Sequence, residues 1–465
     1  MNRPLAPKVG LLPLYLKLYD EVVPELRPKL EAFLGEVAGM LTASGLDVVA
    51  APVCRERPEF AEALAALTAV GVEALVTLHL SYSPSLESAA LLAECSLPLI
   101  LFDTTPSPTF DSSATRQTML ENHGIHGVQD LASVLRRLGK PYHVVAGHPS
   151  RGGVLDEVVG LCRAASAASR LRRMKVGLVG APFKGMGDFA IDAERLAKRV
   201  GPTVVQIDLT DLAKRAAAVS AEEVDAEAAA DGERFDCSAV TRQVLEPSLR
   251  LGLALRQMLD EVDAGAFSMN FQACTAESGL PTVPFLECSK AMARGLGYAG
   301  EGDVLTASVN GALGAAYGDT TFTEMFCPDW RGDTLFMSHM GECNPELASQ
   351  QPKLVEKDYQ FSDVANPVIA LFPLKPGPAT LVNLTQDPGD AFSLIASLVE
   401  VVDTGLVDAF CDVPHFWIRP AKSVRQFLAD YSRAGGTHHL GLMLGNRVAA
   451  VRTLAEMLGA PCVEV

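Results

Sequence analysis

The sequence lacks several features that would assign it to common classes of protein. It contains no run of Lys or Arg, and its 39 basic and 56 acidic residues give a net charge of −17. Nucleic acid and anionic membranes are therefore poor partners. No uninterrupted apolar stretch is long enough to cross a bilayer. None of the ten cysteines forms a C-x-x-C pair, which is typical of reduced, buried thiols in a cytoplasmic protein.

The amino terminus lacks the pattern of a secretory signal. Its apolar run, Val9 to Leu16, is interrupted by proline and is followed by no small-residue cleavage site, so we interpret it as a first strand. Apolar residues are abundant: hydrophobic residues make up 48% of the 465-residue chain and charged residues 20%. This composition is sufficient for large cores, and the length predicts two or three domains.

Residues 1–172 alternate short apolar runs with longer amphipathic ones. The short runs predict strands at Val9–Leu16, Asp47–Val53, Ala74–Leu80, Pro98–Asp103 and Tyr142–Ala146. This β-α order predicts an α/β domain with a doubly wound, mainly parallel sheet of the Rossmann or flavodoxin type. Ligands of such sheets bind beyond the carboxyl ends of the strands.

A second doubly wound α/β domain is expected over residues 173–328. It follows the Ala/Ser/Arg-rich segment Ala164–Arg173, which we interpret as a connector, and it restarts with a strand and turn at Lys175–Phe183. The glycines around Met186 do not complete G-x-G-x-x-G, which argues against a nicotinamide site.

Residues 329–465 have a different sequence pattern, with short apolar runs between Pro/Gly turns. Strands are expected at Thr334–Ser338, Pro367–Pro373, Ala379–Thr385, Leu406–Cys411 and His438–Leu444, with a terminal helix at Val448–Leu458. This pattern predicts a mainly β, barrel-like or sandwiched third domain.

Three ionisable residues stand among small, apolar and hydroxyl residues on either side of the boundary at 328. Glu301 and Glu324 belong to the middle domain and His339 to the third. A carboxylate in apolar surroundings has to be paired, protonated or bound to a cation, so these residues are candidate metal ligands. The alternative is structural: glutamate beside glycine is commonly a solvated turn residue, and a lone histidine is commonly a hydrogen-bonded one.

A pair of histidines, His438 and His439, lies at a turn-to-strand junction and offers a fourth ligand. Successive residues of a strand point to opposite faces, so we expect only one of the two rings to enter a given site. A surface pair is the structural alternative.

Taken together, the motifs resemble those of the L-arabinose isomerase and L-fucose isomerase-like superfamily of aldose-ketose isomerases. The matching segments are GYAGEGDVLTA (Gly297–Ala307), TTFTEMF (Thr320–Phe326), SHMGECNP (Ser338–Pro345), LVNLTQDPG (Leu381–Gly389) and AGGTHHLGLMLG (Ala434–Gly445). They occur in the family's order and approximate spacing. Weaker matches, LKLYDE and ENHGIHGVQD, extend the resemblance into residues 1–172.

The resemblance implies a metal-dependent isomerase that interconverts an aldose and a ketose through a cis-enediol. Glu301, Glu324, His339 and His439 would hold a divalent ion, Mn²⁺ in most of the family. Glu301 and Glu324 would also share the acid and base roles, since a cation and a like charge push paired carboxylate pKa values apart. Which glutamate is the base stays open.

The resemblance further implies substrate contacts from Tyr19, His126 and Met186. His126 would reach the site from a neighbouring subunit, so the enzyme would be a homo-oligomer, a trimer or hexamer, with its active site at a subunit interface. On local grounds His126 is equally a helix N-terminal histidine. The first-strand motif LYLKLYDE departs from the arabinose isomerases, which leaves a pentose, a 6-deoxyhexose or a modified sugar open as the substrate.

Two other functions stay open at this stage. An epimerase on the same scaffold would use the same ligands but yield no ketose. A sugar-binding or regulatory protein could be built from the same β-α repeats, but it has no use for four metal-type ligands.

Overall fold

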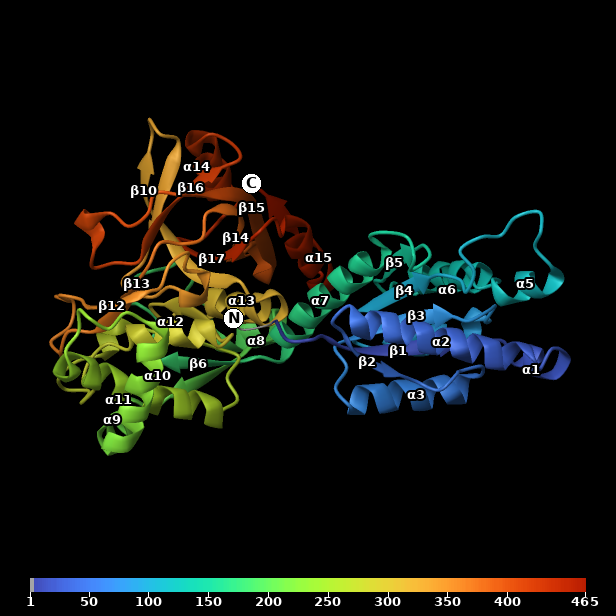
Figure 1. Cartoon of the computed structure of the whole chain (residues 1–465), viewed down its shortest axis with the longest axis horizontal. Coiled ribbons are helices and arrows are strands. Elements are labelled where there is room, and N and C mark those ends of the chain that lie inside the picture. Colours follow the sequence, from blue (N-terminus) through green and yellow to red (C-terminus); the bar gives the residue numbers. More distant parts are fainter. Residues whose placement is uncertain (1–3) are drawn as a thin grey trace. The chain divides into compact units, whose positions relative to one another are not determined.

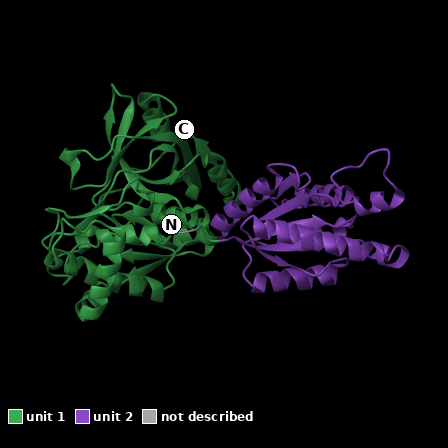
Figure 2. Cartoon of the chain, in the orientation of Figure 1, with its two compact units in different colours: residues 1–5, 170–465 green, residues 6–169 purple. Residues whose placement is uncertain are grey.

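The computed structural model describes residues 4–465, and the chain divides into two compact units (Figures 1 and 2). The N-terminal unit is Ala6–Ser169. The main unit comprises Arg170–Val465 together with residues 4 and 5.

The N-terminal unit is a five-stranded parallel sheet in the order β2-β1-β3-β4-β5. Its strands are β1 (Lys8–Leu14), β2 (Asp47–Ala50), β3 (Ala74–His79), β4 (Leu99–Asp103) and β5 (His143–Ala146). Every residue of the central strand β3 is buried, as expected where helices cover both faces. The helices are α1 (Lys17–Val22), α2 (Leu26–Ala43), α3 (Arg57–Ala69), α4 (Ala89–Glu94), α5 (Arg116–Glu121) and α6 (Ile125–Arg137). The predicted strands and sheet type are confirmed.

The segment interpreted as a connector, Ala164–Arg173, is helical, and the two units divide within it, between Ser169 and Arg170. It forms the second half of α7 (Val154–Arg173). Ala164, Ala165, Ala167 and Ala168 are fully buried. Alanine has the highest helix propensity, and its small side chain lets neighbouring elements approach closely. The alanine-rich composition alone did not distinguish a buried helix from a linker.

The main unit contains a second parallel sheet, in the order β7-β6-β8-β9. Its strands are β6 (Lys175–Val179), β7 (Thr203–Ile207), β8 (Ala266–Met269) and β9 (Gly297–Gly300). The helices of this part are α8 (Ala193–Arg199), α9 (Leu209–Ala218), α10 (Ala221–Arg234), α11 (Arg242–Glu261) and α12 (Phe285–Ala293). The second Rossmann-like sheet is therefore also confirmed.

The rest of the main unit is built on an antiparallel barrel. Its strands close in the order β14-β17-β10-β11-β16-β15, because β14 pairs with β15 as well as with β17. They are β10 (Thr320–Asp329), β11 (Thr334–Ser338), β14 (Gly377–Gln386), β15 (Phe392–Val402), β16 (His415–Pro420) and β17 (His439–Leu444). Outside the ring, β18 (Cys462–Glu464) adds to β15, and β12 (Lys353–Glu356) pairs with β13 (Val368–Leu371). Helices α14 (Val424–Arg433) and α15 (Val448–Leu458) complete the chain. The predicted barrel-like domain is confirmed.

Two details of the barrel differ from the sequence-based expectation. Glu324, assigned to the middle domain by a boundary at 328, lies on the barrel strand β10, because the barrel begins with TTFTEMF and no linker precedes it. The strand expected at Leu406–Cys411 is instead a loop with a 3-10 turn at Asp408–Phe410. The exact domain boundaries stay predictions.

Helix α13 (Val304–Tyr317) joins the parallel sheet to the barrel. Twelve of its 14 residues are buried, and it contacts β8 and β9 on one side and β10, β14 and β17 on the other. A helix that is apolar around most of its circumference belongs in an interior. α13 therefore fixes the carboxyl edge of the sheet against the start of the barrel.

Two further expectations concern membranes and thiols. Across residues 4–465, no helix has the length and apolarity needed to span a bilayer. All ten cysteines are free thiols. Cys162 and Cys288 are buried and Cys95 is half-buried, whereas Cys327 and Cys411 are exposed.

Candidate active site

Strand register places three of the predicted ligands next to one another. Glu324 on β10 lies opposite His439 on β17 and opposite Ser338 on β11. Residues directly opposite in antiparallel strands share a face and lie close together. His339 follows Ser338, and its Nε2 lies 3.7 Å from Glu324 Oε1.

Glu301 reaches the same place from the parallel sheet. It follows β9 directly, at the carboxyl edge where doubly wound sheets bind ligands. Its φ is 62°, a left-handed conformation that costs a non-glycine residue of order 1 kcal/mol or more. Hydrogen bonds hold it there: Glu301 N donates to Met269 O, and Glu301 O accepts from Phe183 N, both at 2.8 Å. A Cβ on the next residue, Gly302, would lie 2.5 Å from Pro182 Cα, so this turn also requires glycine.

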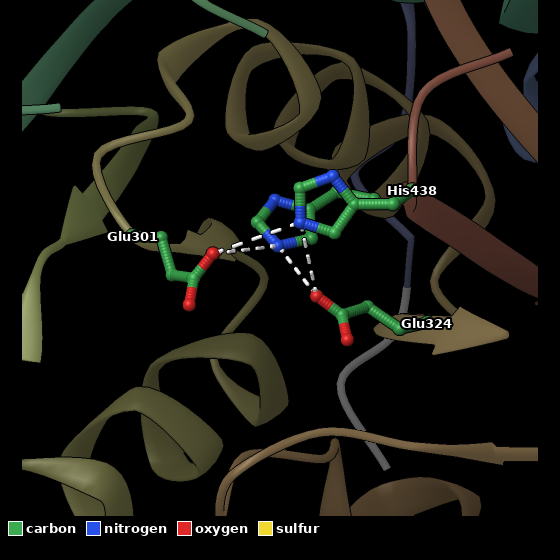
Figure 3. Close-up of side chains that lie close together, drawn as sticks. Glu301, Glu324 and His438 are labelled. Atoms are coloured by element: carbon green, nitrogen blue, oxygen red, sulfur yellow. Dashed lines mark ion pairs between the residues drawn. The ribbon is translucent and has the colours of Figure 1, made fainter. Parts of the chain in front are cut away.

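Three of the four predicted ligands therefore converge in one cluster, which contains His438 in place of His339. His439 Nε2 lies 2.8 Å from Glu324 Oε1 and 3.6 Å from Glu301 Oε2. Ligand atoms of Glu301, Glu324, His438 and His439 all lie within 4.8 Å of one another. Figure 3 shows the two carboxylates pointing toward the ring of His438.

The expectation that only one histidine of the pair enters the site was wrong. His438 Nε2 lies 3.5 Å from Glu324 Oε1 and 3.7 Å from Glu301 Oε2. The reason is local: β17 begins at His439, so His438 still belongs to the preceding turn and the alternation of a strand does not apply to it. Its side chain is 40% exposed, which puts it on the solvent side of the cluster.

Each of the three histidines is oriented by a carboxylate at Nδ1. His339 Nδ1 lies 2.8 Å from Glu342 Oε2, His438 Nδ1 lies 2.7 Å from Asp188 Oδ2, and His439 Nδ1 lies 3.0 Å from Asp303 Oδ2. An ionised carboxylate only accepts, so each Nδ1 carries the hydrogen and each Nε2 faces Glu301 or Glu324.

Sequence reasoning missed these three carboxylates. Asp303 and Glu342 stood inside the matching motifs, and Asp303 has the position of a helix N-cap, accepting from Thr306 N at 2.8 Å. These positions in the sequence could therefore have identified Asp303 and Glu342 as candidate site residues. Asp188 lies 250 positions from His438, and no local pattern could have linked the two residues.

The charges of the cluster shift its pKa values. Burial opposes the charged ring of His339, but Glu342 and Glu324 outweigh it and raise its pKa to about 9. The hydrogen bond to Asp188 is the main cause that raises the pKa of His438 to about 10. Burial alone would raise the pKa of Glu324, yet His339 and His439 lower it. The carboxylates thus draw positive charge into the site.

A divalent cation fits this arrangement. Glu301 Oε2 and His439 Nε2 are buried and make no hydrogen bond to any residue from 4 to 465. In a neutral ring, Nε2 of His439 presents a lone pair to Glu324 Oε1 at 2.8 Å. Two acceptors so close repel each other unless a proton or a cation lies between them. Two carboxylates and two or three imidazoles form a mixed O/N set that suits Mn²⁺ and related ions.

The three predicted substrate contacts are distributed over both units. Met186 lies in the main unit, on the turn after β6 that also carries Asp188. Tyr19 on α1 and His126 on α6 belong to the N-terminal unit. The His126 ring is exposed and contacts His123, with 3.0 Å between Nδ1 and Nε2. Their roles in substrate binding stay predictions.

Comparison with known proteins identifies the family. A sequence model of the L-arabinose isomerase central domain matches residues 190–315, and one of the L-arabinose isomerase C-terminal domain matches residues 319–461. Together these ranges span more than half of the chain. The chain belongs to the L-arabinose isomerase family.

Individual L-arabinose isomerases are similar over most of the chain. The protein from a Nocardioides species is 26% identical over 460 residues, covering 95% of this chain and 91% of its own length. Those from Saccharophagus degradans and Clavibacter sepedonicus are 27% and 28% identical, each covering 74% of this chain and 70% of their own length. The expected arabinose isomerase relationship is confirmed, and with it the enzyme class, aldose-ketose isomerase. The fucose isomerase-like part stays a prediction.

Proposed function

We propose that this protein interconverts an aldose and its ketose with a divalent metal ion held by Glu301, Glu324, His339 and His439. Mn²⁺ is the first candidate. When bound, the ion would act as a Lewis acid and increase the acidity of the proton on C2, the carbon next to the sugar carbonyl. An open-chain aldopentose such as L-arabinose, the sugar in the relatives' names, is the first substrate to test.

The protein's own residues would move the protons. One of the carboxylates of Glu301 and Glu324 would take the proton from C2 and return it to C1 through a cis-enediol, while a second acid or base manages the oxygen protons. His438 is a candidate for that second role, because its Nε2 faces both carboxylates and Asp188 holds its Nδ1. The three Nδ1 carboxylates keep the rings in one orientation throughout the reaction.

The single observation that supports this proposal best is a pair of buried atoms that lie at ion-pair distance from carboxylate or imidazole atoms but make no hydrogen bond. Glu301 Oε2 and His439 Nε2 point into one space from two different folding layers, the parallel sheet and the barrel. A purely structural cluster would be expected to satisfy its buried polar atoms. A cation satisfies both atoms at once.

Conservative replacement of the carboxylates tests the proposal. Glu301→Gln and Glu324→Gln each remove a charge but keep the shape, so we expect a folded protein with ketose formation reduced by about 10³-fold or more. The measurement is ketose formed from an aldose panel with Mn²⁺ present, repeated after removal of metal with a chelator.

Glu400→Gln is the matched control, because Glu400 is an exposed carboxylate on the barrel strand β15. It should retain full turnover. Wild-type-like activity in both Glu301→Gln and Glu324→Gln would refute the proposal. Exchange of the C2 proton with formation of an epimer and no ketose would replace the isomerase with an epimerase.

We further propose a cytoplasmic homo-oligomer, a trimer or hexamer, in which His126 of one subunit completes the site of its neighbour. The N-terminal unit supports this proposal because it exposes His126 and half-exposes Tyr19.

A further inference from the structure

We propose that the substrate is an aldose that carries an apolar, aromatic-sized substituent at the end furthest from its carbonyl, and that a pocket beside His339 binds this substituent. The proposal rests on the function proposed above and specifies its substrate class. The pocket has a volume of about 820 Å³. That is within the range of sites that hold drug-sized ligands, roughly 300–1,000 Å³.

Aromatic side chains form most of the pocket's apolar lining. They come from the β10–β11 hairpin, the loop after β12, and β16 with the loop before it: Phe326, Phe336, Tyr359, Phe361, Phe410 and Trp417. The ring centroid of Phe336 lies 4.8 Å from that of Phe410 and 4.9 Å from that of Trp417. The ring centroids of Tyr359 and Phe361 lie 5.5 Å apart. At such distances the rings support one another.

Two of the rings that line the pocket are exposed to solvent. Phe361 is 66% and Phe326 is 49% exposed. Large exposed apolar patches beside a site commonly mark a binding surface. The loop at 406–411, whose apolar pattern predicted a strand, contributes Phe410 here, so its apolar residues serve the pocket and not a sheet.

Three polar groups of the pocket wall are already engaged, whereas Asp358, Gln360 and Asp412, which also line the pocket, are exposed. Lys357 Nζ donates to Asp412 O at 2.9 Å, Ser338 Oγ donates to Pro414 O at 2.7 Å, and Asp329 Oδ1 accepts from the amide of Gly332 at 2.9 Å. A sugar's hydroxyl groups would find few free partners here, and an unpaired buried hydroxyl is costly. An apolar group has no such cost.

The pocket and the candidate metal site share a wall. Ser338, His339 and Met340 line the pocket, while His339 Nε2 lies 3.7 Å from Glu324 Oε1. A sugar whose reacting carbons lie between Glu301 and Glu324 therefore has the pocket next to it. The far end of the chain is the part free to extend there.

The experiment compares each aldose that the enzyme converts with its benzyl ether at the terminal hydroxyl. Burying a phenyl ring beside these aromatic residues should raise kcat/KM for the ether about tenfold above that for the parent sugar. The double variant Phe326→Ser/Phe361→Ser should lower this preference to near one. Because both rings are exposed, the variant should fold, which circular dichroism checks.

Trp330→Ser is the matched control: Trp330 is also 66% exposed, lies on the same hairpin and does not line the pocket. It should retain the preference. Ketose from the parent sugars without a preference for the ethers would overturn this inference alone. No ketose from any sugar would overturn the proposed function and this inference together. Dissociation of an oligomer by the double variant, with no ether preference in the wild type, would assign the pocket to a subunit interface and overturn the inference.

Discussion

At the scale of single residues, the candidate site is organised by carboxylates that contact histidines and not the proposed ion. Asp303, Glu342 and Asp188 each accept from one Nδ1. Such partners fix the tautomer and raise the basicity of a metal-binding imidazole, and their loss commonly costs about 10–100-fold in metal affinity. The site therefore depends on residues outside its ligand set.

Asp303→Asn tests this dependence. Asparagine caps a helix about as well as aspartate, so α13 should be retained. The neutral amide, however, no longer offers His439 Nδ1 a charged acceptor. We expect Mn²⁺ affinity, measured by calorimetry, to fall about 10–100-fold. Thermal stability of the metal-free protein should change little.

Asp208→Asn is the control for capping. Asp208 caps α9 by accepting from Asp211 N at 2.7 Å and is not part of the cluster. It should leave Mn²⁺ affinity unchanged. Equal losses in both variants would mean that helix capping, and not the orientation of His439, is responsible.

At the scale of elements, α13 determines where Glu301 meets the barrel. The helix approaches β17 so closely that a Cβ on Gly441 would lie 2.1 Å from Asn310 Oδ1. Asn310 itself is tied to the sheet, since its Nδ2 donates to Tyr298 O at 3.0 Å. The sheet, the helix and the barrel thus meet at one contact.

Gly441→Ala should force α13 and β17 apart. Overpacking of a well-filled interior typically costs 1–3 kcal/mol, and we expect a loss of about 2 kcal/mol in the free energy of unfolding, measured by denaturant titration. The shift should also lower isomerase activity, because His439 lies on β17.

Gly314→Ala is the matched change within α13. A Cβ there would meet nothing closer than 3.8 Å, and alanine favours a helix over glycine by up to about 1 kcal/mol. It should be neutral or stabilising. A similar loss at both positions would argue that α13 tolerates no added volume anywhere, against the specific contact described here.

The sequence predicted elements best where their pattern was unambiguous. Strands such as β3 are short apolar runs bounded by turns, and α15 has clear helical spacing. β15 (FSLIASLVEVV) was missed because, at 11 residues, an almost continuous apolar run is as consistent with a buried helix as with a strand. His438 was misjudged because strand alternation was extended by one residue into a turn. Asp188 was beyond reach, because only tertiary structure brings it to His438.

At the scale of the whole molecule, the proposed shared active site predicts complementation between subunits. Mixed oligomers of Glu324→Gln and His126→Ala should regain activity, since some sites would receive an intact Glu324 from one subunit and an intact His126 from its neighbour. For random mixing of equal amounts, about a quarter of the wild-type activity is expected. The variants are co-refolded and ketose formation is measured.

Mixing Glu301→Gln with Glu324→Gln is the control. Both residues lie in the main unit and face the same His439, so no exchange of subunits restores a complete site. Recovery there would point to some other cause, and no recovery with His126→Ala would argue against a shared site. Sedimentation of the wild type gives the subunit number directly.

The backbone of Glu301 has a consequence for laboratory evolution. Glycine would adopt its left-handed conformation without strain, so a screen that rewards thermal tolerance alone puts no pressure on keeping the glutamate. Strained functional positions are where gains in stability commonly come at the expense of activity. Libraries built on this scaffold should therefore hold codon 301 fixed or couple every heat challenge to a turnover assay.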